Sequence, residues 1–140
     1  MSETRLDSFS LGETYVFLKD GGSAPLVAAA GFWQELMSGQ PKSPGVAIVA
    51  GGDGWLVATY PIDRDAQTWE MHPAGDELLT MLTGEMDVVF EQPSGVNAIV
   101  SLVPGQTCLV PRGMWHRQEV RREGTYLGIT YGRGTQHRPR

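Results

Sequence analysis

The chain lacks several features that would place it outside ordinary globular proteins. It has one cysteine, Cys108, so no disulfide can form within the chain, and a reducing compartment is favoured. Its longest apolar runs, such as Val46–Ala50 and Trp55–Ala58, fall far short of a membrane span. The first ten residues contain no apolar segment of the kind that a secretory leader needs. We therefore expect a cytoplasmic protein with no membrane partner.

An excess of positive charge is also lacking. The formal net charge is -5 at pH 7, which disfavours general binding to nucleic acid or to anionic membranes. The basic residues lie late in the chain, because seven arginines follow from Arg112 onward against only Glu119 and Glu123. Two interpretations of this end stay open: a solvated tail, or a tail that docks on an acidic surface of its own or a sister subunit.

The pattern along the chain predicts a single domain that is mostly β-structure. At 140 residues the chain can build one hydrophobic core. From Trp55 to Tyr131, short runs of β-branched and aromatic residues recur between Gly, Pro and Asp with no helical period, which is typical of an antiparallel sandwich or barrel. Earlier, the apolar spacing over Leu26–Met37 predicts a helix, and the turn Gly51–Gly54 predicts a hairpin.

These patterns divide the chain into three parts. Residues 1–45 are expected to form an N-terminal extension whose helix packs on the barrel. Residues 46–131 are expected to form the barrel itself, and residues 132–140 the basic tail. In that tail, the Gly-rich and Arg-rich surroundings of His137 predict a surface position outside any strand.

Two of the three histidines lie beside carboxylates and turn residues. Glu70 and His72 are two apart on a predicted strand, so their side chains face the same way. The turn that follows can bring Glu77 back to the same point, and His116 comes just after the bend at Pro111–Gly113. Carboxylates inside a barrel need a cation or must take up protons. The residues therefore predict a metal site, with a metal-free hydrogen-bonded interior as the competing interpretation.

The spacing of these residues resembles the two motifs of the cupin superfamily. The first motif is matched by Glu70, His72, Glu77 and Gly84, and the second by Gly105, Pro111, Gly113 and His116. The resemblance covers roughly Trp55 to Tyr131. It implies an all-β antiparallel cupin barrel, that is, a double-stranded β-helix or jelly roll. It also implies one divalent metal ion held by Glu70, His72, Glu77 and His116.

The chain departs from the cupin pattern at two positions. Glu70 stands where cupins usually have the first histidine, and Val120 stands where the second motif often ends in asparagine. With Glu70 the ligands become two nitrogens and two oxygens, so two carboxylates formally neutralise a divalent ion and lower its Lewis acidity. Fe, Mn, Ni or Zn suits imidazole plus carboxylate, and we expect one of them.

The alternation of side chains along the strands predicts the surroundings of the site. Met81 shares the inward face of Glu77, Gln118 shares that of His116, and Tyr126 or one of its neighbours closes the pocket from the last strand. Because these inward positions carry few charges, we expect a small, neutral or weakly polar ligand. The outward residues Leu78 and Leu82 are also apolar, so this face should be covered by the N-terminal helix or by a second subunit. We predict a homodimer.

Three functions are compatible with the sequence. The first is a metal-dependent enzyme on a small molecule, of oxygenase, oxidoreductase or isomerase type. The second is a non-catalytic cupin that binds or senses a metal or small ligand, and the third is a metal-free structural barrel. No dedicated general base is visible, so neither a reaction nor a catalytic residue is predicted.

Overall fold

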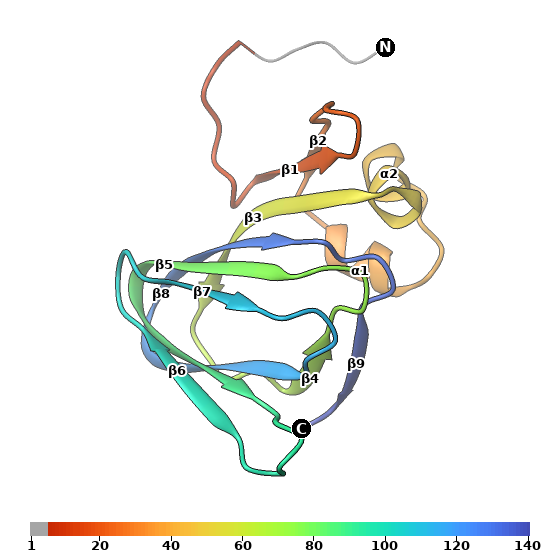
Figure 1. Cartoon of the computed structure of the whole chain (residues 1–140). Helices are drawn as coiled ribbons and strands as arrows, with labels where there is room; N and C mark the ends of the chain where they lie inside the picture. The colour runs from red at the N-terminus through yellow and green to blue at the C-terminus, as the bar shows by residue number, and fades with distance from the viewer. Residues whose placement is uncertain (1–5) are drawn as a thin grey trace.

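The fold, a computed structural model that describes residues 6–140, is an antiparallel sheet that curls around an interior (Figure 1). Within these residues, nine strands join in one sheet in the order β2-β1-β3-β8-β4-β9, and β5 pairs with β6, β7 and β8. The elements are β1 (Thr14–Lys19), β2 (Leu26–Ala28), α1 (Phe32–Met37), α2 (Pro44–Gly51), β3 (Gly54–Ile62), β4 (Thr68–Met71), β5 (Glu77–Phe90), β6 (Ala98–Leu102), β7 (Thr107–Val110), β8 (His116–Thr130) and β9 (Gln136–Pro139).

The two longest strands, β5 and β8, bend together. Their pairing shifts register between Met81 and Met86, and Gly84 lies in this stretch at φ 74°. A Cβ atom there would lie 2.5 Å from the carbonyl oxygen of Arg122 on the neighbouring strand. Only glycine therefore fits, both in backbone conformation and in space. This bend lets β5 contribute to both walls of the barrel.

Two clusters of buried apolar residues hold the fold together. The first fills the barrel and consists of Ile62, Leu79, Met81, Met86, Val88, Phe90, Leu102 and Val110. The second joins β1 and β3 to the helices and consists of Tyr15, Phe17, Val27, Phe32, Val46, Leu56 and Ala58. The second cluster thus packs the helices and β2 against β1 and β3.

The secondary structure of that N-terminal part differs from the prediction. The helix expected over Leu26–Met37 is helical only in α1, because Leu26–Ala28 pairs with β1 as a strand and Gly31 follows at φ 72°. The apolar run Val46–Ala50 lies in α2, not in a strand, so the hairpin predicted at Gly51–Gly54 is wrong. Pro44 favours the helix, since proline fits its first turn.

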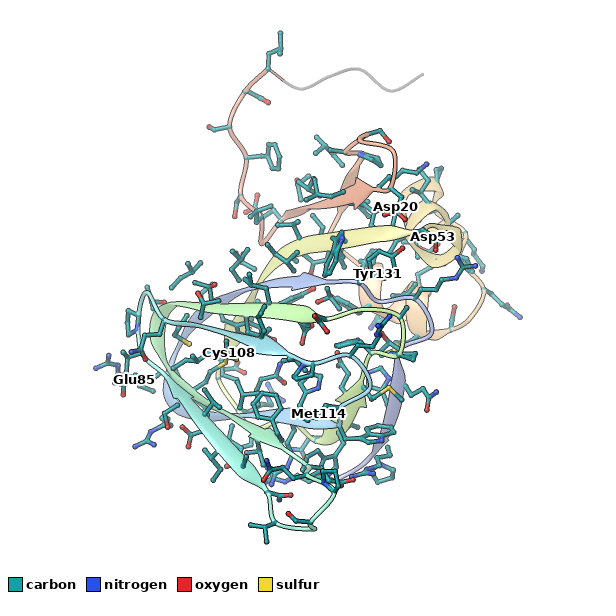
Figure 2. The ribbon with its side chains drawn as sticks, viewed as in Figure 1. Asp20, Asp53, Glu85, Cys108, Met114 and Tyr131 are labelled. Atoms are coloured by element: carbon teal, nitrogen blue, oxygen red, sulfur yellow. The ribbon has the colours of Figure 1, made fainter. Side chains whose placement is uncertain are left out.

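The C-terminal segment is part of the sheet. Residues Gln136–Pro139 form β9 and pair with β4, so the prediction that His137 lies outside any strand is wrong. The interpretation of a tail docked on its own acidic surface fits best, since Arg138 pairs with Glu91, Arg140 with Glu119 and Arg133 with Asp53. Nearby, the Tyr131 hydroxyl donates to Asp20 at 3.1 Å, and Figure 2 shows Asp20, Asp53 and Tyr131 gathered beside the N-terminal strands.

The outer face of the barrel is only partly exposed at the two leucines singled out from the sequence, because Leu78 is half-buried and Leu82 is exposed. Leu82 is 45% exposed and Leu109, next to β5 on β7, is 62% exposed. The N-terminal helix does not cover them, since Trp33 and Leu36 of α1 line the interior cavity described below. The helix alternative is therefore wrong, and the homodimer stays a prediction that sedimentation at micromolar concentration would test. Among the described helices, none is long and apolar enough to cross a membrane.

Candidate metal centre

Strand pairing brings the four predicted ligands to one end of the barrel. Glu70 on β4 lies directly opposite His116 on β8, and residues opposite each other in an antiparallel pair point to the same face. Glu77 begins β5 opposite Thr130 of β8. His72 follows β4 directly, two residues after Glu70, and so shares its face. All four side chains therefore point into the interior.

The turns of the two sequence motifs are hydrogen-bonded to each other. The backbone N–H of Gly113 donates to the carbonyl oxygen of His72 at 2.9 Å. The backbone N–H of Arg112 donates to Oδ1 of Asp76 at 2.8 Å. Gly113 adopts φ 81°, a conformation that favours glycine. These bonds fix the loop that carries His72 against the loop that precedes His116.

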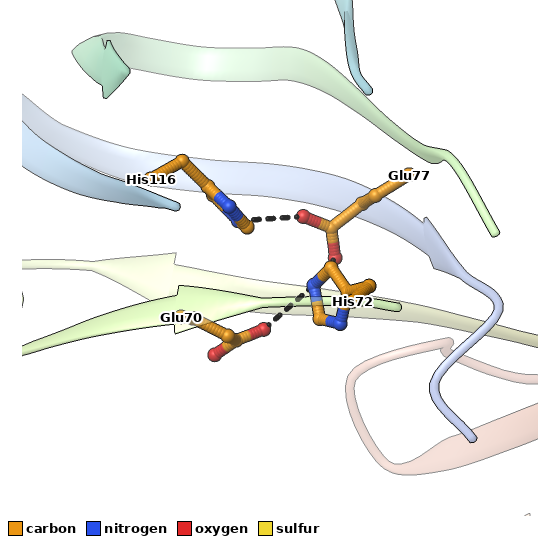
Figure 3. Close-up of side chains that lie close together, drawn as sticks. All are labelled: Glu70, His72, Glu77 and His116. Carbon is orange, nitrogen blue, oxygen red and sulfur yellow. Dashed lines mark hydrogen bonds and ion pairs between the residues drawn. The ribbon is translucent and has the colours of Figure 1, made fainter. Parts of the chain in front are cut away.

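The four ligand atoms lie within 4.8 Å of one another (Figure 3). Nε2 of His72 lies 2.9 Å from Oε1 of Glu70 and 3.3 Å from Oε2 of Glu77. Nε2 of His116 lies 3.1 Å from Oε1 of Glu77. His72, Glu77 and His116 are at most 5% exposed, whereas the Glu70 side chain is 37% exposed. Three of the four predicted ligands are thus buried, and Glu70 is the one exposed to solvent.

Each of the two histidines uses Nδ1 for a hydrogen bond outside the cluster. This bond determines that, in the neutral ring, the Nε2 facing the carboxylates carries no proton. Thr135 donates its only hydroxyl hydrogen to the carbonyl oxygen of Gly132, so at 2.8 Å it accepts the Nδ1–H of His72. Nδ1 of His116 lies 3.2 Å from the carbonyl oxygen of Met114, which can only accept. In their neutral forms both imidazoles therefore turn the lone pair of Nε2 toward carboxylate oxygens. This contact is repulsive unless a cation lies between them.

The pKa shifts of His72 and Glu77 also indicate that a positive charge is favoured at the centre of the cluster. Burial alone lowers the pKa of His72, but the carboxylates of Glu70 and Glu77 outweigh burial and raise this pKa to about 9. Burial raises the pKa of Glu77, yet His116 and His72 outweigh it and hold this pKa below its usual range. In the metal-free protein a proton can take the central position, and a divalent ion would compete with it.

Two further residues, not identified from the sequence, support the cluster. His137 lies opposite Glu70 in the β4–β9 pair, with its Nε2 3.3 Å from Oε2 of Glu70. This contact and that of His72 outweigh burial and lower the pKa of Glu70. Thr130 donates its hydroxyl to Oε2 of Glu77. Glu70 and Glu77 are thus each held by a partner outside the predicted ligand set.

A cavity of about 520 Å³ opens beside the cluster and is lined in part by Glu70, His72 and Glu77. Of the predicted pocket residues, Gln118 and Tyr126 line this cavity. Met81 does not, because it lies four residues beyond Glu77 along β5 and is fully buried among the core side chains of the barrel. The alternation of side chains along β5 correctly predicts that Met81 points inward. It does not predict where along β5 the cavity ends and the apolar core begins.

The donor set suits a divalent ion of the first transition series. Two imidazole nitrogens and two carboxylate groups converge, and the buried Nε2 of His72 has no hydrogen-bond partner among the described residues. The free thiol of Cys108 packs on the apolar core and is not a member of the cluster. The residues present therefore fit a metal ion with nitrogen and oxygen ligands and no sulfur.

Comparisons with known proteins give the fold. No protein-family model and no curated protein matches the chain. Among solved structures, it is similar to Peruvianin-I, a cysteine peptidase from Thevetia peruviana latex, with a TM-score of 0.52, 17% identity, and coverage of 61% of this chain and 56% of that chain. It is also similar to an oxalate oxidase, with a TM-score of 0.49, 19% identity, and coverage of 58% and 44%.

A cupin-2 domain containing protein from Shewanella frigidimarina is similar as well, with a TM-score of 0.48, 17% identity, and coverage of 55% of this chain and 70% of that chain. The chain spans about half the length of the peptidase and of the oxidase. At 17% identity the likeness to the peptidase concerns the fold alone. With its antiparallel strand order and both motifs at the barrel end, the chain has the all-β cupin barrel that the motif spacing predicts.

Proposed function

We propose that this cupin-fold chain binds one divalent metal ion on Glu70, His72, Glu77 and His116 and acts on a small molecule in the adjoining cavity. One observation carries the proposal: two buried imidazoles, each with Nδ1–H bound to an oxygen acceptor, turn Nε2 toward the carboxylates of Glu70 and buried Glu77, 2.9–3.3 Å away. Such outer contacts orient histidine ligands in metal proteins.

The protein's own residues would place and shield the ion. Thr135 and the carbonyl of Met114 orient the two histidines, while Thr130 and His137 hold the carboxylates. When bound, Fe, Mn, Ni or Zn supplies Lewis acidity, and the first three also supply redox chemistry. Gln118 and Tyr126 offer polar groups to a ligand from the cavity wall.

An enzyme of oxygenase, oxidoreductase or isomerase type is the activity we favour. Such an enzyme needs a route for its substrate to the metal, and the exposed edge of Glu70 at the cavity supports one. A cupin that only binds or senses a metal would be served by a closed site. The proposal therefore depends on metal binding first and on ligand access second.

Elemental analysis of protein purified without an affinity tag or chelator tests the metal. We expect about one equivalent of Fe, Mn, Ni or Zn in the wild type and none in the His72→Ala/His116→Ala double variant. Glu91→Gln changes a carboxylate that pairs with Arg138 outside the cluster, and should retain the metal. A folded wild type that holds no metal and takes none up on titration would refute the proposal.

A further inference from the structure

The wall of the cavity opposite the cluster comes from the N-terminal part of the chain. Phe17 of β1, Trp33 and Leu36 of α1, and Val49 of α2 all line it. None of these residues belongs to the motifs that position the cluster. The cavity therefore has a polar side that carries the cluster and an apolar side built largely by residues 14–54. A ligand that fills it must be apolar over much of its surface.

Aromatic rings run along this apolar side toward the cluster. Ring centroids lie 4.9 Å apart for Phe32 and Trp33, 5.9 Å for Trp33 and Tyr60, and 5.5 Å for Tyr60 and Tyr126. Trp33, Tyr60 and Tyr126 line the cavity. Trp33 donates its Nε1–H to the Tyr15 hydroxyl at 3.2 Å and is still 39% exposed. A tryptophan fixed in this way offers a preformed surface for another ring.

The charged side chains around the cavity are paired. Glu70 and Glu77 face histidines, and Arg133 pairs with Asp53. A divalent ion on the cluster would also be neutralised by its two carboxylates. No lining charge is thus left over, among the described residues, for an ionic ligand, whereas Gln118 and the two phenols offer hydrogen bonds. The cavity therefore favours an uncharged ligand.

We propose that the cavity binds an uncharged aromatic alcohol, phenol or ketone of one or two fused rings. Its ring lies against Trp33 and Tyr60, and its oxygen points to the cluster. The direction of the oxygen rests on the proposed metal site, whereas recognition of the ring rests on the apolar wall alone. A volume of about 520 Å³ is ample for two fused rings.

Equilibrium dialysis with three probes tests the proposal: 2-naphthol, its saturated analogue decahydro-2-naphthol, and 2-naphthoate. We expect 2-naphthol to bind roughly 3- to 10-fold more tightly than the saturated alcohol, the range that aromatic contacts give. The naphthoate anion should bind more weakly than 2-naphthol. Equal affinity for the two alcohols, or tighter binding of the anion, would overturn the proposal.

Variants of Trp33 show whether the preference arises at this wall. Trp33→Ala should abolish the preference for the aromatic alcohol, and Trp33→Phe should keep most of it. Trp55→Ala is the matched control, because the Trp55 ring packs on Tyr131 and does not line the cavity. An unchanged preference in Trp33→Ala, or a loss in Trp55→Ala alone, would contradict the assignment.

The same dialysis separates this proposal from the metal site. Wild type stripped of metal by a chelator should still prefer 2-naphthol over its saturated analogue. Failure of the protein to bind metal would thus refute the proposed function and leave ring recognition standing. A metal-loaded protein without the preference would refute ring recognition alone.

Discussion

The two ends of the barrel interior shift the pKa values of ionisable groups differently: one end keeps such a group neutral, and the other keeps it charged. At the apolar end, Cys108 packs on the core, and burial raises the pKa of its thiol to about 11, which keeps it neutral. At the other end, Glu77 is more deeply buried than the half-buried Cys108, yet its histidine neighbours lower its pKa and keep it charged. One strand, β5, passes through both environments, since Leu79 and Met81 follow Glu77 on the same face.

This difference shows that the polar end is not a requirement of the fold. Two positions along β5 from Glu77, the same inward face is filled by apolar side chains at 1% exposure or less. A buried carboxylate is costly in such a place unless opposite charge compensates it. The proposed metal ion would supply that charge, and each experiment below changes one end while leaving the other intact.

The largest effect on stability should come from the apolar end. Met86 is 0% exposed, so Met86→Ala should lower the free energy of unfolding by about 2–5 kcal/mol through lost packing and a cavity. Denaturant unfolding measures this change. Val103→Ala, at a position 39% exposed, should change it by less than about 0.5 kcal/mol. Similar costs at both positions would contradict the assignment of the core.

At the polar end, stability should depend on the metal. A divalent ion at about 100 times its dissociation constant should stabilise the wild type by about 2.7 kcal/mol. Glu77→Gln should lose most of that gain, because it removes a buried carboxylate from the cluster. Glu85→Gln, which changes a carboxylate 33% exposed and 3.9 Å from Arg122, should keep it. Equal gains in both variants would place the metal elsewhere.

Changing the support of His72 should have a smaller effect. Thr135→Val removes the acceptor for Nδ1–H, so metal affinity should fall by about 10- to 100-fold, as when outer partners of metal ligands are lost. Competition with a chelating indicator measures this affinity. Thr135→Ser should restore it, and Thr107→Val, at an exposed threonine paired with Thr80, should leave it unchanged. An unaltered affinity in Thr135→Val would show that this contact does not orient the ligand.

A further test of the apolar end requires no mutation. With a pKa of about 11, Cys108 should carry roughly 100-fold less thiolate at pH 8 than an unfolded cysteine. Alkylation by iodoacetamide, followed by mass spectrometry, should therefore be slower by about that factor in the folded protein than in urea. Equal rates would show that the apolar end does not suppress ionisation as described.

The sequence predicts the cluster better than the cavity, for a physical reason. Spacing of two along a strand and a turn before Glu77 determine local direction, so residues close in sequence converge. The apolar wall depends on packing between Trp33 of α1 and Tyr60 of β3, which no local pattern encodes. Likewise, His137 contacts Glu70 only because β9 pairs with β4. The Gly and Arg residues around His137 give no strand pattern, so the sequence does not predict this strand.

The sequence prediction is wrong at two segments before the barrel, where the local composition or spacing favours one structure and the surrounding chain favours another. Val46–Ala50 has the β-branched composition of a strand, but it follows Pro44 and packs as part of α2 against the second core. Leu26–Ala28 has helical spacing toward Met37 but becomes a strand by pairing with β1. In both cases tertiary contacts outweigh local preference.

X-ray absorption at the edge of the bound metal tests the central claim, that the ion is held by two imidazoles and two carboxylates, most directly. Fe-, Mn-, Ni- or Zn-loaded protein should show a first shell of nitrogen and oxygen only, with outer-shell scattering from two imidazole rings that falls to one in His116→Ala. A sulfur shell, or scattering unchanged by that substitution, would contradict the account.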